Sequence, residues 1–210
     1  GAVVGSSVTG EMDKIDGPYY LFPTIKAIVD NVPKWLPLLG VEGGKIPIVP
    51  VDYVADATVA IAHKPGLDGM AFQLLQAPQD STGKIMEILF DAAHGPGFAR
   101  QFELPRMPKL VGEGLRQTAR MLPLKAAAKE MTRATGIPAA ALGYITSQVS
   151  FDDKQARDAL RGTGISCPRL EDYAFRLWDY WERNLDPDLF IDRTLKGQVQ
   201  GKVVVITGGS

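Results

Sequence analysis

The sequence is poor in the residues that form disulfides and metal sites. Its 210 residues include one cysteine, Cys167, which excludes an internal disulfide and favours a reducing compartment such as the cytoplasm. Cys167 lies between a serine and a proline without catalytic context, so a structural thiol is favoured over a nucleophile. The two histidines, His63 and His94, are far apart and lack the spacing of metal ligands. We therefore predict no metal site.

Long apolar runs and an excess of charge of either sign are also missing. No apolar run reaches the roughly 18 residues that a membrane-spanning helix needs, and the start lacks the layout of a signal peptide. The 23 Lys and Arg residues nearly balance the 24 Asp and Glu residues, so no global field favours nucleic acid as a partner. We expect one globular domain or two small ones, with no membrane span and no nucleic-acid binding.

The last ten residues carry the pattern of a nucleotide-binding unit. Val203 to Ile206 is a continuous apolar run between glycines, which predicts a strand buried on both faces. The turn after it is Thr207-Gly208-Gly209-Ser210, which is typical of the opening of a dinucleotide-binding βαβ unit. Thr207, Gly208, Gly209 and Ser210 are therefore predicted to bind cofactor; a buried strand with a tight turn is the alternative. Because the chain starts with another apolar run, at Ala2–Val4, we expect it to be a piece of a longer protein.

The first hundred or so residues alternate between predicted strands and helices. A strand at Ala2–Val4 precedes a polar loop from Gly5 to Pro18. A helix is predicted from Tyr20 to Asn31, and Val32-Pro33 ends it. The apolar stripe of this helix consists of Leu21, Ile25, Ile28 and Val29.

The same alternation continues in the next fifty residues. A β-rich run at Ile46–Val51 precedes Asp52, which is predicted to be the N-cap of a helix that reaches His63. A strand is predicted at Met70–Leu75, followed by a helix that Ser81 or Thr82 caps. His94-Gly95-Pro96-Gly97 closes that helix, and we interpret His94 as a helix-end residue rather than a catalytic one. The predicted buried side of the first of these helices is Val54, Ala57, Val59, Ala60 and Ile61, and the second carries Ile85, Ile88, Leu89 and Ala92.

From about Phe98 to Ser150 the pattern indicates helix without strand. Two short amphipathic segments are predicted, Leu110 to Met121 and Leu124 to Thr135. One interpretation is a helical hairpin with a solvated basic face; the other is a surface for an anionic, lipid-like group, either a membrane interface or a phosphorylated acyl carrier. The basic residues Lys109, Arg116, Arg120, Lys125, Lys129 and Arg133 outnumber Glu113 and Glu130.

Two more helices are predicted before the chain end. One starts at Phe151-Asp152-Asp153 and runs to Arg161, and a longer one opens at Pro168 and runs to about Asn184. The long helix is rich in aromatic residues along one face, which indicates docking against a core; ligand stacking is the alternative. Ile191 to Gln200 is predicted to be a linker. The stripe consists of Leu170, Tyr173, Ala174, Leu177, Trp178 and Trp181.

Together these patterns predict an α/β protein in three parts. Residues 1–98 are predicted to form the C-terminal part of one α/β domain, which the resemblance described below makes its substrate side, and residues 99–190 a mainly helical annex. Residues 191–210 form a linker and the first strand of a second α/β domain, which is truncated.

Several stretches of the chain carry a resemblance to a known family. The more specific ones are Thr-Gly-Glu-Met-Asp-Lys at 9–14 and Leu-Trp-Asp-Tyr-Trp at 177–181; Val-Asp-Tyr-Val at 51–54 and Thr-Gly-Gly-Ser at 207–210 occur more widely. With these stretches the chain resembles the bacterial two-domain fatty acyl-CoA reductases. In that family an extended short-chain dehydrogenase/reductase domain of Rossmann type is joined to a second dehydrogenase/reductase domain.

The resemblance implies a function for the whole protein. It would reduce a long-chain fatty acyl thioester, on CoA or on an acyl carrier, with NADPH to an aldehyde or alcohol. Val3 would lie at the nicotinamide, unless it is only a core strand residue, and the loop from Ser6 to Tyr20 would line the acyl pocket. Thr207 to Ser210 would begin the pyrophosphate turn of the second domain.

The family's catalytic Tyr-x-x-x-Lys pair is absent from the sequence, because no tyrosine is followed four residues later by lysine. We therefore assign no catalytic residue and expect the chain alone to be inactive. Two other hypotheses stay open: a piece of a nucleotide-sugar epimerase or dehydratase, and a non-catalytic scaffold that binds lipid or carrier.

Overall fold

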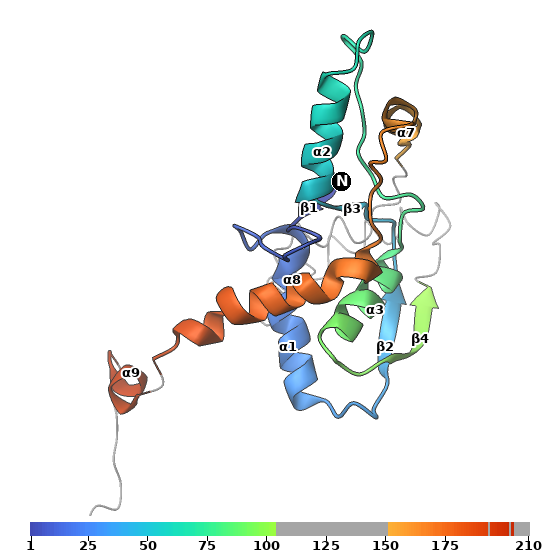
Figure 1. Ribbon diagram of the computed structural model, residues 1–210. Coiled ribbons are helices and arrows are strands. Elements are labelled where there is room, and N and C mark those ends of the chain that lie inside the picture. The colour runs from blue at the N-terminus through green and yellow to red at the C-terminus, as the bar shows by residue number, and fades with distance from the viewer. Residues whose placement is uncertain (104–150, 193, 202, 204–210) are drawn as a thin grey trace, which may run out of the picture.

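The computed structural model describes residues 1–103, 151–192, 194–201 and 203. They form two short parallel strand pairs with helices packed beside them (Figure 1). The strands are β1 (Ala2–Val4), β2 (Leu38–Glu42), β3 (Ile48–Pro50) and β4 (Phe98–Glu103). The helices are η1 (Gly17–Leu21), α1 (Phe22–Asn31), α2 (Val51–Ala62), α3 (Thr82–Ala92), α7 (Lys154–Leu160), α8 (Leu170–Asn184), η2 (Pro187–Phe190) and α9 (Leu195–Val199), where η marks a 3₁₀ helix.

Both strand pairs are parallel, as the α/β prediction requires. β1 pairs with β3, with Ala2 opposite Ile48 and Val4 opposite Pro50, and β2 pairs with β4. Parallel neighbours need a crossover connection, and here α1 lies between β1 and β3 in the chain while α2 and α3 lie between β2 and β4. The described chain therefore has α/β architecture, and the predicted fold class is confirmed at that level.

The larger hydrophobic core lies between α1, α3 and α8. Phe22 of α1 is fully buried and packs against two tryptophans of α8, with ring centroids 5.2 Å from Trp178 and 5.5 Å from Trp181. Offset and edge-on aromatic pairs of this kind add to the gain from area burial. The predicted stripe of α8 is confirmed, since its members are all buried: Leu170, Tyr173, Ala174, Leu177, Trp178 and Trp181.

A second, smaller core joins β3, α2 and α7. Val49 of β3 packs with Tyr53 and Ala57 of α2 and with Leu160 of α7. The predicted buried side of α2 is largely right, but Val59 is wrong because its side chain is 59% exposed. The buried residues of α2 are Tyr53 and Ala57, and Tyr53 was not part of the predicted set.

Two strand predictions fail for the same physical reason. Met70–Leu75 is not a strand, because within the described chain this run has no strand partner. Phe98–Glu103 was expected to begin a helical region, but it is strand β4 and pairs with Leu38–Glu42, which was not predicted as a strand. Whether such a run becomes a strand depends on a pairing partner that can lie about sixty residues away. The local periodicity of the sequence carries no information about that partner.

The helix ends are mostly as predicted. Ser81 is the N-cap of α3 and accepts a hydrogen bond from the Lys84 amide, while Val32 ends α1. The predicted start at Tyr20 lies in η1, which leads directly into α1. Asp52 is not an N-cap: Pro50 takes that position, and Asp52 lies in the first turn of α2 with its carboxylate free to bond elsewhere.

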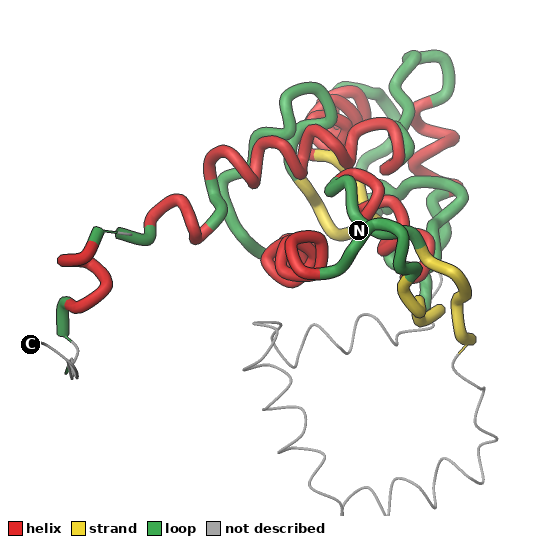
Figure 2. Tube along the Cα trace, turned by 90° about the horizontal axis from the view of Figure 1, so that it is seen from below, coloured by secondary structure: helices red, strands yellow, loops and turns green. Residues whose placement is uncertain are grey.

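Several predictions fall on residues outside the described ranges: the two basic amphipathic segments, the last strand beyond Val203, and Thr207 to Ser210. Within the described part, α9 lies in the predicted linker and extends away from the cores in both views (Figures 1 and 2). α3 and α8 share one core across the predicted boundary near residue 98, and the three-part division stays a prediction. Among the helices described here, none has the length and apolarity needed to cross a bilayer.

Candidate functional site

The candidate site lies at the carboxyl end of the parallel pair β1–β3. In α/β sheets this edge is where ligands bind, because loops that leave parallel strands converge there. β1 is followed by the Gly5–Glu11 loop, and β3 leads directly into α2. β1 and β3 lie side by side at the foot of α2 (Figure 1). This placement brings the Gly5–Glu11 loop next to the first turn of α2.

Asp52 in that first turn holds the loop from one side. Its carboxylate accepts two hydrogen bonds from Ser7, one from the amide at 2.7 Å and one from the hydroxyl at 2.5 Å. Bonds to an ionised acceptor are stronger than neutral ones, and here both oxygens of the carboxylate are used. Asp52 therefore connects the loop after β1 to the helix after β3.

Tyr19 holds the loop from the interior. Its hydroxyl oxygen accepts a hydrogen bond from the Gly5 amide at 2.6 Å, and the side chain is 2% exposed. Burial raises the pKa of Tyr19 to about 12; the Gly5 bond lowers the pKa and the charge of Asp16 raises it further. The phenol is therefore neutral near pH 7 and acts as a structural hydrogen-bond acceptor.

Helix α8 holds the loop from the third side. The Arg176 guanidinium donates to the Ser7 carbonyl at 3.2 Å, and Gly10 lies directly against the backbone of Arg176. Gly10 has φ of 76°, and a Cβ added there would overlap the Arg176 carbonyl. Only glycine fits this combination of left-handed backbone and close approach.

Val3, the described member of the predicted cofactor-binding set, lies at the edge of the β1–β3 pair. Its side chain is 49% exposed and lines a cavity of about 400 Å³. Val3 stands opposite Val49, which is buried. The predicted contact between Val3 and the nicotinamide stays a prediction. The other side chains around the cavity include Val54, Phe72, Leu74 and Phe151.

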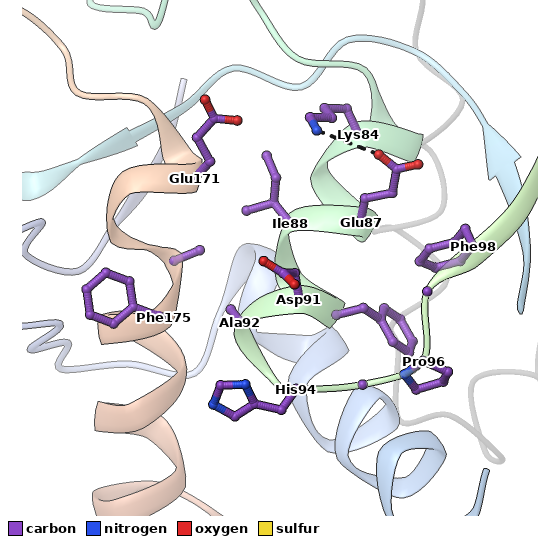
Figure 3. A pocket seen from close by; sticks show the side chains of 14 residues that line it. Lys84, Glu87, Ile88, Asp91, Ala92, His94, Pro96, Phe98, Glu171 and Phe175 are labelled. Atoms are coloured by element: carbon purple, nitrogen blue, oxygen red, sulfur yellow. Dashed lines mark ion pairs between the residues drawn. The ribbon is translucent and has the colours of Figure 1, made fainter. Parts of the chain in front are cut away.

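A second hollow, of about 680 Å³, lies between α3 and α8. Figure 3 shows Glu171 and Phe175 of α8 across from Ile88, Asp91 and Ala92 of α3, with His94 near one end. Two of its carboxylates are paired, Glu87 with Lys84 at 3.7 Å and Glu171 with Arg169 at 3.0 Å. His94 has φ of 56° and follows the last turn of α3, so its predicted place at the helix end is confirmed. No group of three potential metal ligands occurs among the described residues.

Cys167 is partly buried and packs against the smaller core of β3, α2 and α7. The thiol donates to the Pro168 carbonyl at 3.5 Å, and burial, with the charge of Asp52 as a smaller cause, raises its pKa to about 12. A thiol with so high a pKa is protonated near pH 7 and is a poor nucleophile. This agrees with the structural role predicted from the sequence.

Sequence reasoning missed the three residues that hold the loop, namely Tyr19, Asp52 and Arg176. The paired glycines at Gly5 and Gly10 were the available signal, because glycine at both ends of a short polar loop indicates close backbone approach. A Cβ on Gly5 would lie 2.5 Å from the Glu11 carbonyl, which accounts for the first of them.

These features define an α/β fold with a fixed loop at the ligand-binding edge of a parallel strand pair. No family model matches the sequence, and no curated protein does. Among solved structures, the chain is similar in fold to the terminal R domain from the myxalamid PKS-NRPS biosynthetic pathway, with a TM-score of 0.55 and 19% sequence identity over 87% of this chain. The chain spans 42% of the length of that R-domain chain. At 19% sequence identity, the similarity between the two chains shows a shared fold and nothing further.

Proposed function

We propose that the chain is part of an NADPH-dependent reductase of long-chain fatty acyl thioesters, on CoA or on an acyl carrier, that yields an aldehyde or alcohol. The observation that carries the proposal is the fold likeness, over most of the chain, to the terminal R domain, a reductase domain from a biosynthetic pathway. The stretches at 9–14 and 177–181 support fatty acyl thioesters as the substrate class, because these stretches resemble those of fatty acyl-CoA reductases.

In this proposal the nicotinamide end of the cofactor binds in the cavity beside Val3. The half-exposed Val3 and the apolar walls of the neighbouring cavity fit a flat, uncharged ring at the sheet edge. When bound, NADPH supplies the hydride for reduction. In this proposal, Val3 orients the ring through packing and backbone, and Phe72 and Leu74 exclude water from it.

Calorimetric titration of the 210-residue chain tests the substrate part of the proposal. We expect saturable binding of lauroyl-CoA, and binding of free CoA and of a nucleotide-sugar at least about tenfold weaker. Preference for the nucleotide-sugar would instead support an epimerase or dehydratase. We also expect no acyl-CoA-dependent oxidation of NADPH by the chain alone, because the Tyr-x-x-x-Lys pair is absent from its sequence.

A further inference from the structure

The hollow between α3 and α8 has an apolar floor that continues the larger core. Ile88 and Ala92 of α3 and Ala174 of α8 line the hollow, and all three belong to that core. Because the two alanine side chains are short, the helices leave a trough of about 680 Å³ between them. An apolar group that enters the trough would therefore pack directly on the core that joins α3 to α8.

An exposed aromatic residue also lines the hollow. Phe175 of α8 follows the buried Ala174 and is itself 50% exposed. The Arg176 guanidinium lies over its ring, 4.5 Å from the centroid, and leaves half of the side chain open to solvent. Aromatic side chains beside a buried apolar patch are frequent anchors of protein–protein contacts. Phe175 therefore offers the hollow an anchor for a partner.

The rim of the hollow is negatively charged. Three carboxylates line it, those of Glu87, Asp91 and Glu171, against one lysine, Lys84. Lys84 lies 3.7 Å from Glu87, and within the described part of the chain Asp91 makes no ion pair. Figure 3 shows Glu171 on α8 across from Glu87 and Asp91 on α3. The charge of this rim is complementary to a cationic partner.

The exposure of the rim favours a macromolecular partner over a small ligand. Small-molecule sites bury roughly 70–90% of a ligand. Here the charged side chains of Lys84, Glu87 and Glu171 are each at least 39% exposed. An apolar centre with an exposed polar rim is the usual anatomy of a protein–protein contact. A trough between two helices also matches the groove that receives the apolar face of an amphipathic helix.

We propose that the hollow between α3 and α8 binds a basic amphipathic helix of a partner protein. The apolar face of that helix packs on Ala92, Ala174 and Phe175, and its lysine or arginine side chains pair with Asp91 and Glu171. The negative rim repels phosphates and acidic carrier proteins, so this partner differs from the substrate of the proposed function. The inference does not rest on that function.

Fluorescence anisotropy with a synthetic peptide tests the proposal. The probe is a labelled peptide of about eighteen residues with leucine at positions i, i+3, i+4 and i+7 and lysine elsewhere. The 210-residue chain should bind it saturably with a Kd below about 100 μM, and should bind a glutamate counterpart at least about tenfold more weakly. Added salt should weaken binding of the lysine peptide, because the rim charges are exposed.

Variants in the hollow locate the binding. Asp91→Asn combined with Glu171→Gln should weaken binding about fivefold, because exposed ion pairs contribute modestly. Phe175→Ala should weaken it at least about tenfold, as removal of an aromatic anchor does. The matched controls are Glu182→Gln, at another exposed carboxylate of α8, and Phe190→Ala, at an exposed phenylalanine outside the hollow. Each control should change the affinity less than about twofold.

Three results would overturn the proposal: no saturable binding of the lysine peptide, equal binding of the two peptides, or equal losses in the variants and their controls. Sedimentation of the unliganded chain tests a second copy as the occupant, and a dimer that Phe175→Ala dissociates would also overturn the partner helix. Lauroyl-CoA affinity should be unchanged in Phe175→Ala. Failure of peptide binding can therefore be told apart from failure of the proposed function.

Discussion

Replacing Tyr19 with phenylalanine removes one hydrogen-bond acceptor from a buried site. The side chain is 2% exposed and its hydroxyl accepts from the Gly5 amide at 2.6 Å, so the ring keeps its packing while a buried amide loses its partner. Leaving a buried donor unsatisfied costs about 1–3 kcal/mol of the free energy of unfolding. For a chain of this length, a central value of about 2 kcal/mol corresponds to a fall of roughly 4–8 °C in Tm.

The assay is urea and thermal unfolding of Tyr19→Phe beside Tyr20→Phe. Tyr20 is the matched control, because it is the neighbouring tyrosine and accepts from none of the Gly5–Glu11 amides, so its free energy of unfolding should change by less than about 0.5 kcal/mol. Amide exchange should speed up at Gly5 in Tyr19→Phe. If both variants unfold alike, the bond at Gly5 is not a stabilising contact and the account of the loop fails.

The pH dependence gives a second check on Tyr19. Its pKa is raised from 10.0 to about 12 by burial, so the folded state holds the phenol proton more tightly than the unfolded state. The contribution of the Tyr19 proton to the free energy of unfolding is therefore fully present below pH 10. This contribution is lost as the pH rises through about 12. The stability difference between the unmodified chain and Tyr19→Phe should shrink over that range, and a growing difference would contradict the assignment.

Three further predictions follow from single contacts. Gly10→Ala should cost about 2–4 kcal/mol, because its Cβ overlaps α8, whereas Gly66→Ala, with similar φ and open space, should cost about 1 kcal/mol; equal losses in urea unfolding would refute the clash. Lys26→Met should cost about 2–4 kcal/mol by leaving the buried Asp186 carboxylate without its cation, and the double variant with Asp186→Asn should recover part of the loss in a double-mutant cycle. Cys167→Ala should flatten the loss of stability between pH 9 and about 12, since burial raises the thiol pKa over that interval; an unchanged slope would count against it.

Local patterns in the sequence predicted those elements that depend on residues close to one another in the chain. The stripe of α8 repeats with the helical period, so its burial could be predicted without knowing that α1 and α3 cover it. A helix cap at Ser81 or Thr82 could be predicted, and Ser81 takes the position, because the bond that an N-cap accepts comes from an amide only three residues away. β2 and β4 were missed because each is a strand only through the other.

The contacts of the candidate site could not be predicted from local patterns either, because they join residues far apart in the chain. Asp52 follows a strand and precedes a helix, so the local rule predicts an N-cap, but its carboxylate serves Ser7, 45 residues away. Arg176 reaches Ser7 across 169 residues. The family resemblance alone suggested that the loop after β1 faces a ligand. Of the contacts that fix the shape of this loop, only the close backbone approaches at Gly5 and Gly10 had a local signal in the sequence.

The geometry of the loop depends on the core more than on its own sequence. Gly10 and Ser7 contact α8 at Arg176, and α8 is oriented by Leu177, Trp178 and Trp181, which pack into the core with α1 and α3. Packing of this density does not permit small continuous shifts, so α8 has a defined position against the loop. The aromatic stripe, which the sequence offered as either core or ligand-stacking residues, therefore acts on the site as core. It positions the helix whose Arg176 contacts the Gly5–Glu11 loop.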